Sequence, residues 1–105
     1  MIDWSKVDEL KDDIGADDFE EIVEVFLAEV EEALEVLPST PVSGLEESLH
    51  FLKGSALNLG FSAFSDLCQI GEKSAANGAS ETIDVPAIIH CYAASKEAFL
   101  TGPHA

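Results

Sequence analysis

Residues 45–60 read LEESLHFLKGSALNLG. Apolar residues recur in this stretch at steps of three and four, which is the spacing of one face of an α-helix. The pattern predicts a helix over about residues 42–59, and Gly60 is expected to end it because glycine commonly closes helices. The apolar seam of this helix consists of Leu45, Leu49, Leu52, Ala56 and Leu59.

Similar patterns on both sides of this stretch predict four more helices. Residues 19–37 repeat apolar positions at helical steps with glutamates between them, until the segment 38–41, PSTP, breaks the pattern. Shorter helices are expected over about residues 3–13 and 62–76. Asp84 is a suitable N-cap for a last helix. The expected buried side of that helix consists of Val85, Ile88, Ile89, Tyr92, Phe99 and Leu100.

The fold class follows from these elements and their connections. No segment alternates apolar and polar residues between turn signals, so no sheet is expected. The connections are short, which makes consecutive helices antiparallel neighbours. The sequence therefore predicts an all-α fold, an antiparallel up-down-up-down four-helix bundle with a short extra N-terminal helix. A chain of 105 residues is expected to form a single domain over residues 1–105.

Composition and charge exclude several classes of function. The formal net charge of −16 disfavours nucleic acids and anionic membranes as partners, and we expect a monomer. No signal peptide or membrane span is recognisable, so we expect a cytoplasmic protein, and Met1 favours a free-standing one. Cys68 and Cys91 lie in apolar helical patterns and are expected to be buried free thiols. Without a CxxC or HExxH motif, no metal site is expected.

Three residues lie together on the outer face of the third predicted helix, over residues 42–59. At about 100° per residue, His50 points roughly 140° from the apolar seam, Lys53 lies on the same flank, and Gly54 points outward. These positions are neighbours on a helix surface. A glycine inside a helix costs about 1 kcal/mol relative to alanine, so Gly54 needs a reason to be there.

This patch has two of the three groups that phosphoryl transfer to histidine requires, and the third must come from an adjacent helix. A neutral imidazole is a nucleophile near neutral pH, a nearby ammonium stabilises the charge of a phosphoryl group, and an acceptor must hold the second ring nitrogen. On the residues alone, a solvated helix face explains His50 and Lys53 equally well. Gly54 favours access, because no helix is expected to pack against an outward position.

The run of residues 50–60, HFLKGSALNLG, resembles the signature of histidine-containing phosphotransfer (HPt) domains, which reads approximately H-x-L-K-G-[SA]-[SA]-x-x-L-G. The resemblance implies a four-helix bundle with the histidine on the third long helix. It also implies a relay of phosphate to or from receiver-domain aspartates of response regulators, or from a histidine kinase. A second reading is a non-phosphorylated binding module that docks on a receiver or a kinase, and a purely structural bundle would leave Gly54 unexplained.

By this resemblance, His50 is the phosphoryl acceptor, Lys53 balances the charge of the phosphate, and Gly54 clears the approach. The family places an imidazole-orienting Gln or Glu on the following helix, and here that position is Glu72. Gln69, one turn earlier, is the alternative.

Phe51 and Leu57 flank His50 away from the seam and form a possible docking surface, although contact with another part of the bundle is equally compatible. His90 and His104 lack the Lys-Gly pair and are weaker candidates.

The chain contains no GxxxxGK[ST] run and no other glycine-rich nucleotide loop. We therefore expect a covalent phosphocarrier without an ATP site or autokinase activity, not an enzyme. No cofactor is expected on this chain, and Mg²⁺ is expected on the partner receiver domain.

Overall fold

The computed structural model describes residues 2–102, and in that range it contains five α-helices and two short 3₁₀ turns. The helices are α1 (Trp4–Ile14), α2 (Ala16–Val36), α3 (Val42–Leu59), α4 (Ser62–Ala76) and α5 (Val85–Thr101), and the turns are η1 (Leu37–Ser39) and η2 (Ser80–Thr82). Within the same range the only β-type pairing is an isolated bridge between Ile2 and Phe61. The expectation of an all-α fold is confirmed.

Short polar residues and glycines set the ends of the helices. Asp3 and Asp84 lie outside α1 and α5, and their carboxylates accept hydrogen bonds from the amides of Lys6 and Ala87 at 3.3 and 3.0 Å. Gly60 ends α3 with φ of 76°, in the left-handed region that suits glycine. Its carbonyl accepts a hydrogen bond from the amide of Asp3 at 2.7 Å, which ties the start of the chain to the α3–α4 turn.

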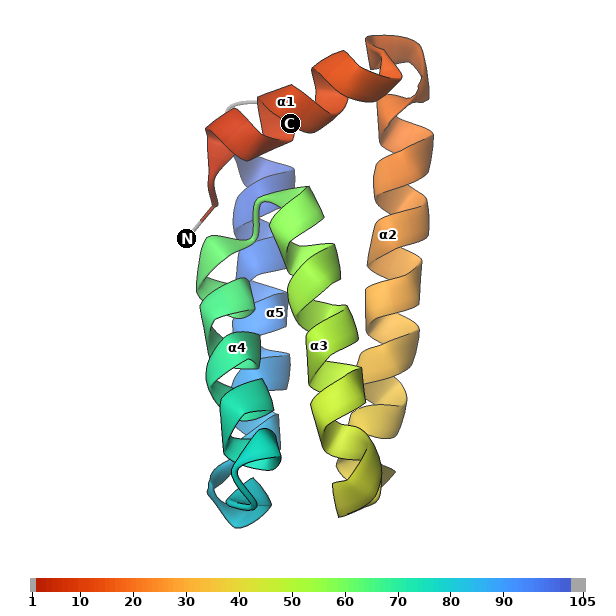
Figure 1. Cartoon of the computed structure of the whole chain (residues 1–105). Coiled ribbons are helices and arrows are strands. Elements are labelled where there is room, and N and C mark those ends of the chain that lie inside the picture. The colour runs from red at the N-terminus through yellow and green to blue at the C-terminus, as the bar shows by residue number, and fades with distance from the viewer. Residues whose placement is uncertain (1, 103–105) are drawn as a thin grey trace.

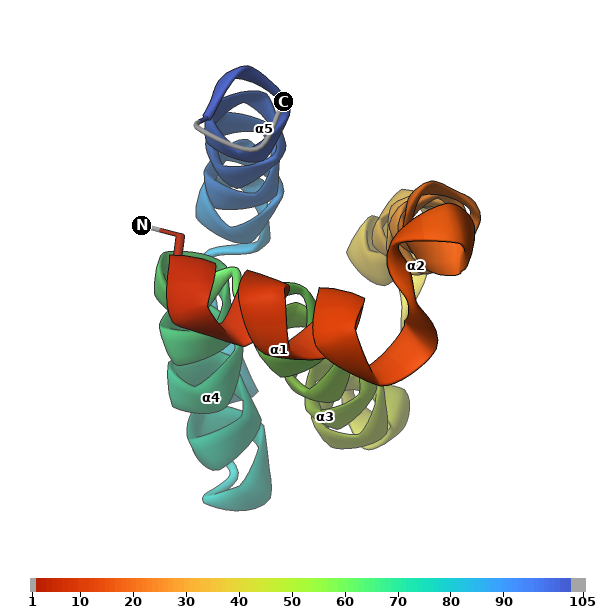
Figure 2. The same cartoon turned by 90° about the horizontal axis from the view of Figure 1, so that it is seen from above.

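Figure 1 shows α2 to α5 side by side along the long axis of the molecule, with α1 lying across one end. The principal extents are 43, 20 and 19 Å, so the long helices define the shape. The most extensive packing is between α3 and α4, whereas α1 and α2 also contact α3 and α5 contacts α4. In the view from above, α2 and α5 lie apart on one side of the α3–α4 pair (Figure 2).

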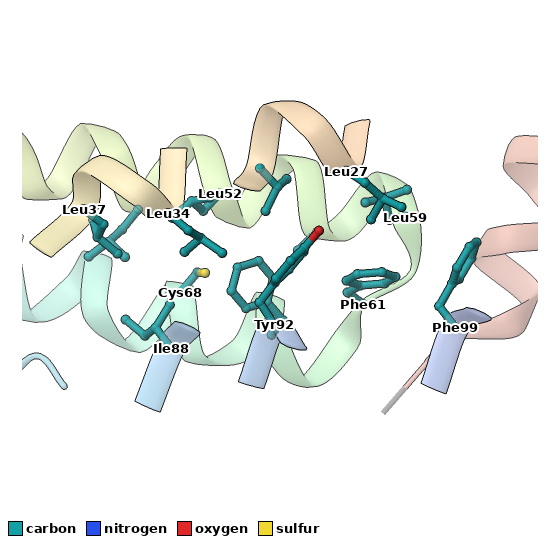
Figure 3. Packing of buried hydrophobic residues seen from close by; sticks show 14 of the residues in the cluster. Leu27, Leu34, Leu37, Leu52, Leu59, Phe61, Cys68, Ile88, Tyr92 and Phe99 are labelled. Carbon is teal, nitrogen blue, oxygen red and sulfur yellow. The ribbon is translucent and has the colours of Figure 1, made fainter. Parts of the chain in front are cut away.

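One apolar cluster runs through the inside of the bundle. Figure 3 shows leucines of α2 and α3 facing Cys68, Ile88 and Tyr92 from α4 and α5. All five seam residues of α3 are buried, as the spacing of residues 45–60 predicts. Phe61, Phe64, Tyr92 and Phe99 add aromatic contacts, with ring centroids 5.4 to 6.1 Å apart. The α3 helix is therefore anchored along its length, and its opposite face stays free.

The prediction that Leu100 is buried is wrong, because this residue is 52% exposed. Phe99 occupies the inward position at this level of α5 and stacks on Trp4, with ring centroids 5.8 Å apart. The next residue then points about 100° away from the core.

The two cysteines are free thiols in this structure, Cys68 buried and Cys91 half-buried. Burial raises the pKa of the Cys68 thiol to about 12, with smaller contributions from Cys91 and Glu72, so this thiol stays protonated at neutral pH.

Between residues 2 and 102, every helix is too short or too polar to cross a lipid bilayer.

Candidate functional site

His50 lies in the middle of α3, on the side away from the core, and its side chain is 70% exposed. The buried residues Leu49 and Leu52 lie on either side of it in the sequence and fix the rotation of the helix. The imidazole is nevertheless held at one atom: its Nδ1 lies 2.7 Å from Oε2 of Glu72 on α4. The structure therefore brings together two of the residues that the sequence singles out.

Glu72 also contacts Lys53, a third residue that the sequence singles out. Its other oxygen, Oε1, lies 2.7 Å from Nζ of Lys53, so one carboxylate bridges the lysine and the histidine. The side chains of Lys53 and Glu72 are only 23% and 17% exposed, which places this ion pair at the edge of the α3–α4 interface. The pair is thus shielded on one side by the two helices, and the imidazole projects beyond it.

The charge state of Glu72 decides what the imidazole can do. The hydrogen bond from Lys53 lowers the pKa of the Glu72 carboxyl, the bond from His50 adds to this effect, and desolvation opposes it. The carboxylate is therefore ionised at neutral pH and can only accept hydrogen bonds. It follows that Nδ1 carries the ring proton and donates a hydrogen bond to Glu72. In the neutral ring, Nε2 then has the free lone pair and is the nucleophilic atom.

Gly54 has open space where a side chain would be. A Cβ atom built at this position meets nothing within 4 Å. Gly71, the glycine inside α4, differs: a Cβ there would lie 3.0 Å from Cδ1 of the buried Leu49. Close packing of α3 and α4 therefore explains Gly71, whereas no contact among residues 2–102 explains Gly54.

Apolar side chains surround the histidine on the exposed face. Phe51 and Leu57 are 44% and 51% exposed. Phe51 also lines a shallow hollow of about 330 Å³ with Ala33 and Val36 of α2, and Glu29 and Glu32 lie at its edge. The sequence pattern alone does not predict this contribution of α2. Val36 is the last residue of α2 and is 56% exposed. It lies next to Phe51 because of how α2 and α3 are placed relative to each other, which the sequence of either helix does not show.

The remaining candidates lie apart from this arrangement. Gln69 is exposed on α4, and the hydrogen bond of the His50 ring goes to Glu72 instead. His90 is exposed on α5, and His104 lies outside the described residues. In the part of the chain that the structure describes, no three His, Cys, Asp or Glu side chains are grouped so that they could hold a metal ion.

Comparison with known proteins gives matches over most of the chain. The family model described as Hpt domain matches residues 21–98. Two curated relatives are each named Phosphorelay protein LuxU, from Vibrio vulnificus strains YJ016 and CMCP6. Each is 31% identical over 107 residues, which cover 96% of this chain and 93% of the relative. No solved structure matches the chain significantly.

Proposed function

This chain belongs to the Hpt domain family, and on that premise we propose that Nε2 of His50 accepts a phosphoryl group and passes it on. The observation that supports this assignment is the bridge of Glu72 between Nδ1 of His50 and Nζ of Lys53. It holds the ring by one nitrogen and leaves the other available on a side chain that is 70% exposed. The proposal assigns the whole chain, 1–105, to one up-down-up-down bundle that works as a single domain.

In the proposed step, the lone pair of Nε2 attacks the phosphorus of an aspartyl phosphate on the partner. An N–P bond forms, the P–O bond to the aspartate breaks, and the aspartate leaves as a carboxylate. The proton on Nδ1 stays in place, and the positive charge that develops on the ring is balanced by Glu72. The same steps run backwards when His50 donates the group to a second receiver.

Lys53 and Gly54 support the transfer in different ways. The phosphoryl group carries negative charge throughout, and the ammonium of Lys53 lies one helical turn from His50, where it can turn from Glu72 to the phosphate. Gly54 leaves the space over the next turn of α3 empty, so that a partner's active site can approach the ring. Phe51 and Leu57 form the apolar part of the docking surface.

The proposed partners are receiver domains of response regulators and a histidine kinase. The receiver provides the aspartate and the Mg²⁺ ion, and this chain contributes no cofactor of its own. Because the sequence has no nucleotide-binding loop, we propose a phosphocarrier without autokinase activity. We further propose that it works in the cytoplasm as a monomer and binds neither nucleic acid nor membrane, in line with its charge of −16.

His50→Gln tests the assignment. A phosphorylated receiver domain is mixed with the wild type, with His50→Gln and with His90→Gln, and the label on each is measured. His90 is a matched control because it is also an exposed helix histidine. We expect labelling of the wild type and of His90→Gln by a bond that is labile in acid and stable in base, and none of His50→Gln.

Full labelling of His50→Gln, with a native helical spectrum, would exclude His50 as the acceptor. The alternative, a docking module without phosphate, predicts that the wild type also remains unlabelled while it still binds the receiver.

A further inference from the structure

α5 carries a second row of side chains beside the one that faces the core. The core row is Ile88, Tyr92, Ser95 and Phe99. The second row is Val85, Ile89, Ala93, Lys96 and Leu100, at steps of three and four residues. A helix with one apolar stripe packs against one neighbour, so a second stripe indicates a second contact. Leu100, which is 52% exposed, is the clearest sign that this contact is not made among residues 2–102.

Four residues of the second row, Ile89, Ala93, Lys96 and Leu100, line an open groove between α2 and α5. The groove encloses about 750 Å³, and its other lining residues include Leu34, Pro38 and Tyr92. A hollow of about 650 Å³ continues it towards the start of α5 and shares Pro38, Ile89 and Ala93. α2 and α5 are not among the helix pairs with extensive contact, and they lie apart in Figure 2. We call this surface the α2–α5 groove.

The groove has an apolar floor and an acidic rim. Glu31 and Glu35 of α2 and Glu97 of α5 lie along its edges, with Lys96 as the cation of the lining. Lys96 is already paired, since its Nζ lies 2.6 Å from Oε2 of Glu31, which also accepts the hydroxyl of Tyr92 at 2.7 Å. Glu35 and Glu97 have no ion pair within residues 2–102. The free charge of the rim is therefore negative.

We propose that the α2–α5 groove binds an amphipathic α-helix of another protein, with its apolar stripe on α5 and with lysines or arginines against Glu35 and Glu97. A helix presented this way is a common mode of recognition by an apolar groove. The row on α5 extends from Val85 to Leu100, about 22 Å along the helix axis, so a partner helix of about 15 residues would cover it.

Other occupants fit less well. A small ligand is usually buried over most of its surface, and this groove is open along one side. A second copy of this chain, or an anionic bilayer, would bring like charge to the acidic rim. The proposal goes beyond phosphotransfer and uses none of its residues, because His50, Lys53 and Glu72 lie on α3 and α4. Either proposal can therefore fail without the other.

Two synthetic helices of 16 residues test the proposal with the full chain. Both have the same leucine stripe, one has lysines on the flanks and the other has glutamates, and binding is followed by fluorescence anisotropy. We expect the lysine peptide to bind, with an affinity that falls as salt is added, and the glutamate peptide not to bind. Amide shifts in NMR spectra should locate the bound peptide at Leu34, Ile89, Ala93 and Leu100.

Three variants distinguish binding of the peptide in the groove from general attraction of a cationic peptide to an acidic protein. Glu35→Lys with Glu97→Lys should weaken binding by about fivefold to tenfold, since each exposed charge contact contributes modestly. Leu100→Ser should weaken it without unfolding the chain, because Leu100 is exposed. Two matched charge reversals, Glu20→Lys with Glu21→Lys on exposed positions of α2, should leave the affinity within about twofold.

The proposal would be overturned if the two double charge reversals lowered the peptide affinity equally, or if both peptides bound equally well. Amide shifts in NMR spectra confined to residues outside the groove would overturn it too. Concentration-dependent dimerisation through Leu100 would overturn it as well and identify a second copy as the occupant.

Discussion

A single carboxylate contacts both His50 and Lys53. Glu72 accepts from Nδ1 of His50 with one oxygen and from Nζ of Lys53 with the other, each at 2.7 Å. The two contacts have different consequences. The first fixes the tautomer of the imidazole, and the second holds an ammonium beside it. A change at position 72 therefore alters the ring and the lysine together, whereas a change at position 53 alters only one of them.

Glu72→Ala should release the imidazole. Without the acceptor, the population with the proton on Nε2 rises, and that tautomer has no lone pair at the proposed reactive atom. We expect altered ¹⁵N shifts of the His50 ring in NMR spectra and transfer slower by at least about tenfold. Glu72→Gln is the matched variant, because its amide oxygen can replace one of the two contacts but not both. Unchanged ring shifts in Glu72→Ala would mean that Gln69 or water orients the ring.

Lys53→Met should lower stability in a pH-dependent way. The pKa of the folded Glu72 carboxyl is lowered from 4.5, mainly by the hydrogen bond from Lys53, so the folded state gains stability above pH 4.5 and loses it as the pH falls through the lowered pKa. The variant lacks most of this gain. We expect it to be less stable than the wild type by at most about 1 kcal/mol at pH 7, because the pair lies near the surface.

The measurement is urea unfolding of both proteins at pH 7 and at pH 3, where the difference should shrink. Phosphotransfer by Lys53→Met should also be slower, and an equal rate in the two proteins would remove Lys53 from the proposed site.

Much of this arrangement could be predicted from the sequence, and the part that could not depends on how the helices pack against each other. The spacing of 100° per residue places His50, Lys53 and Gly54 on one face of a helix, since that depends on α3 alone. The choice of Glu72 over Gln69 came from the resemblance to a family. The contact between Glu72 and Lys53 was not predicted, because it depends on how α3 and α4 are rotated relative to each other.

At the scale of the helix, we expect alanine to affect stability differently at the glycine inside α3 and at the one inside α4. Gly54→Ala meets open space, and alanine is favoured over glycine in a helix by about 1 kcal/mol, so this variant should be more stable by nearly that amount. Its transfer should nevertheless be slower if the empty space serves the partner's approach. Gly71→Ala places a methyl 3.0 Å from the buried Leu49 and should be less stable than Gly54→Ala. Thermal unfolding and transfer rates check both.

Gly54→Ala with higher stability and an unchanged transfer rate would contradict the access role of Gly54 and leave the glycine without an explanation.

The helix boundaries were predicted well, whereas one orientation was not. Local signals such as Asp84 before α5 and Gly60 after α3 act within one turn, so they can be read without the fold. The direction of Leu100 depends instead on Trp4, which stacks on Phe99 from the opposite end of the sequence. Such a contact fixes the last turn of α5 only after the chain has folded.

At the scale of the whole molecule, charge is the dominant feature. A net charge of −16 is carried by a chain with a radius of gyration of 13.9 Å. The screening length of salt is about 30 Å at 0.01 M and about 10 Å at 0.1 M. At the lower concentration it exceeds the radius of gyration, so the carboxylates repel one another across the bundle. The unfolded chain spreads the same charges over a larger volume, which means that this repulsion destabilises the folded state.

Added salt should therefore stabilise this protein, although it weakens the Lys6–Glu9, Lys53–Glu72 and Lys96–Glu31 pairs. These three favourable contacts among residues 2–102 are few against an excess of sixteen like charges, so repulsion decides the sign. We expect the melting temperature to rise by about 5 °C or more between 0.01 and 0.2 M NaCl, since about 1 kcal/mol shifts it by that amount in a domain of this size. The measurement is thermal unfolding followed by circular dichroism, repeated with sodium sulfate at equal ionic strength. Equal shifts in both salts identify screening, because preferential exclusion would make sulfate more effective. A melting temperature that stays constant or falls would show that the ion pairs outweigh the repulsion.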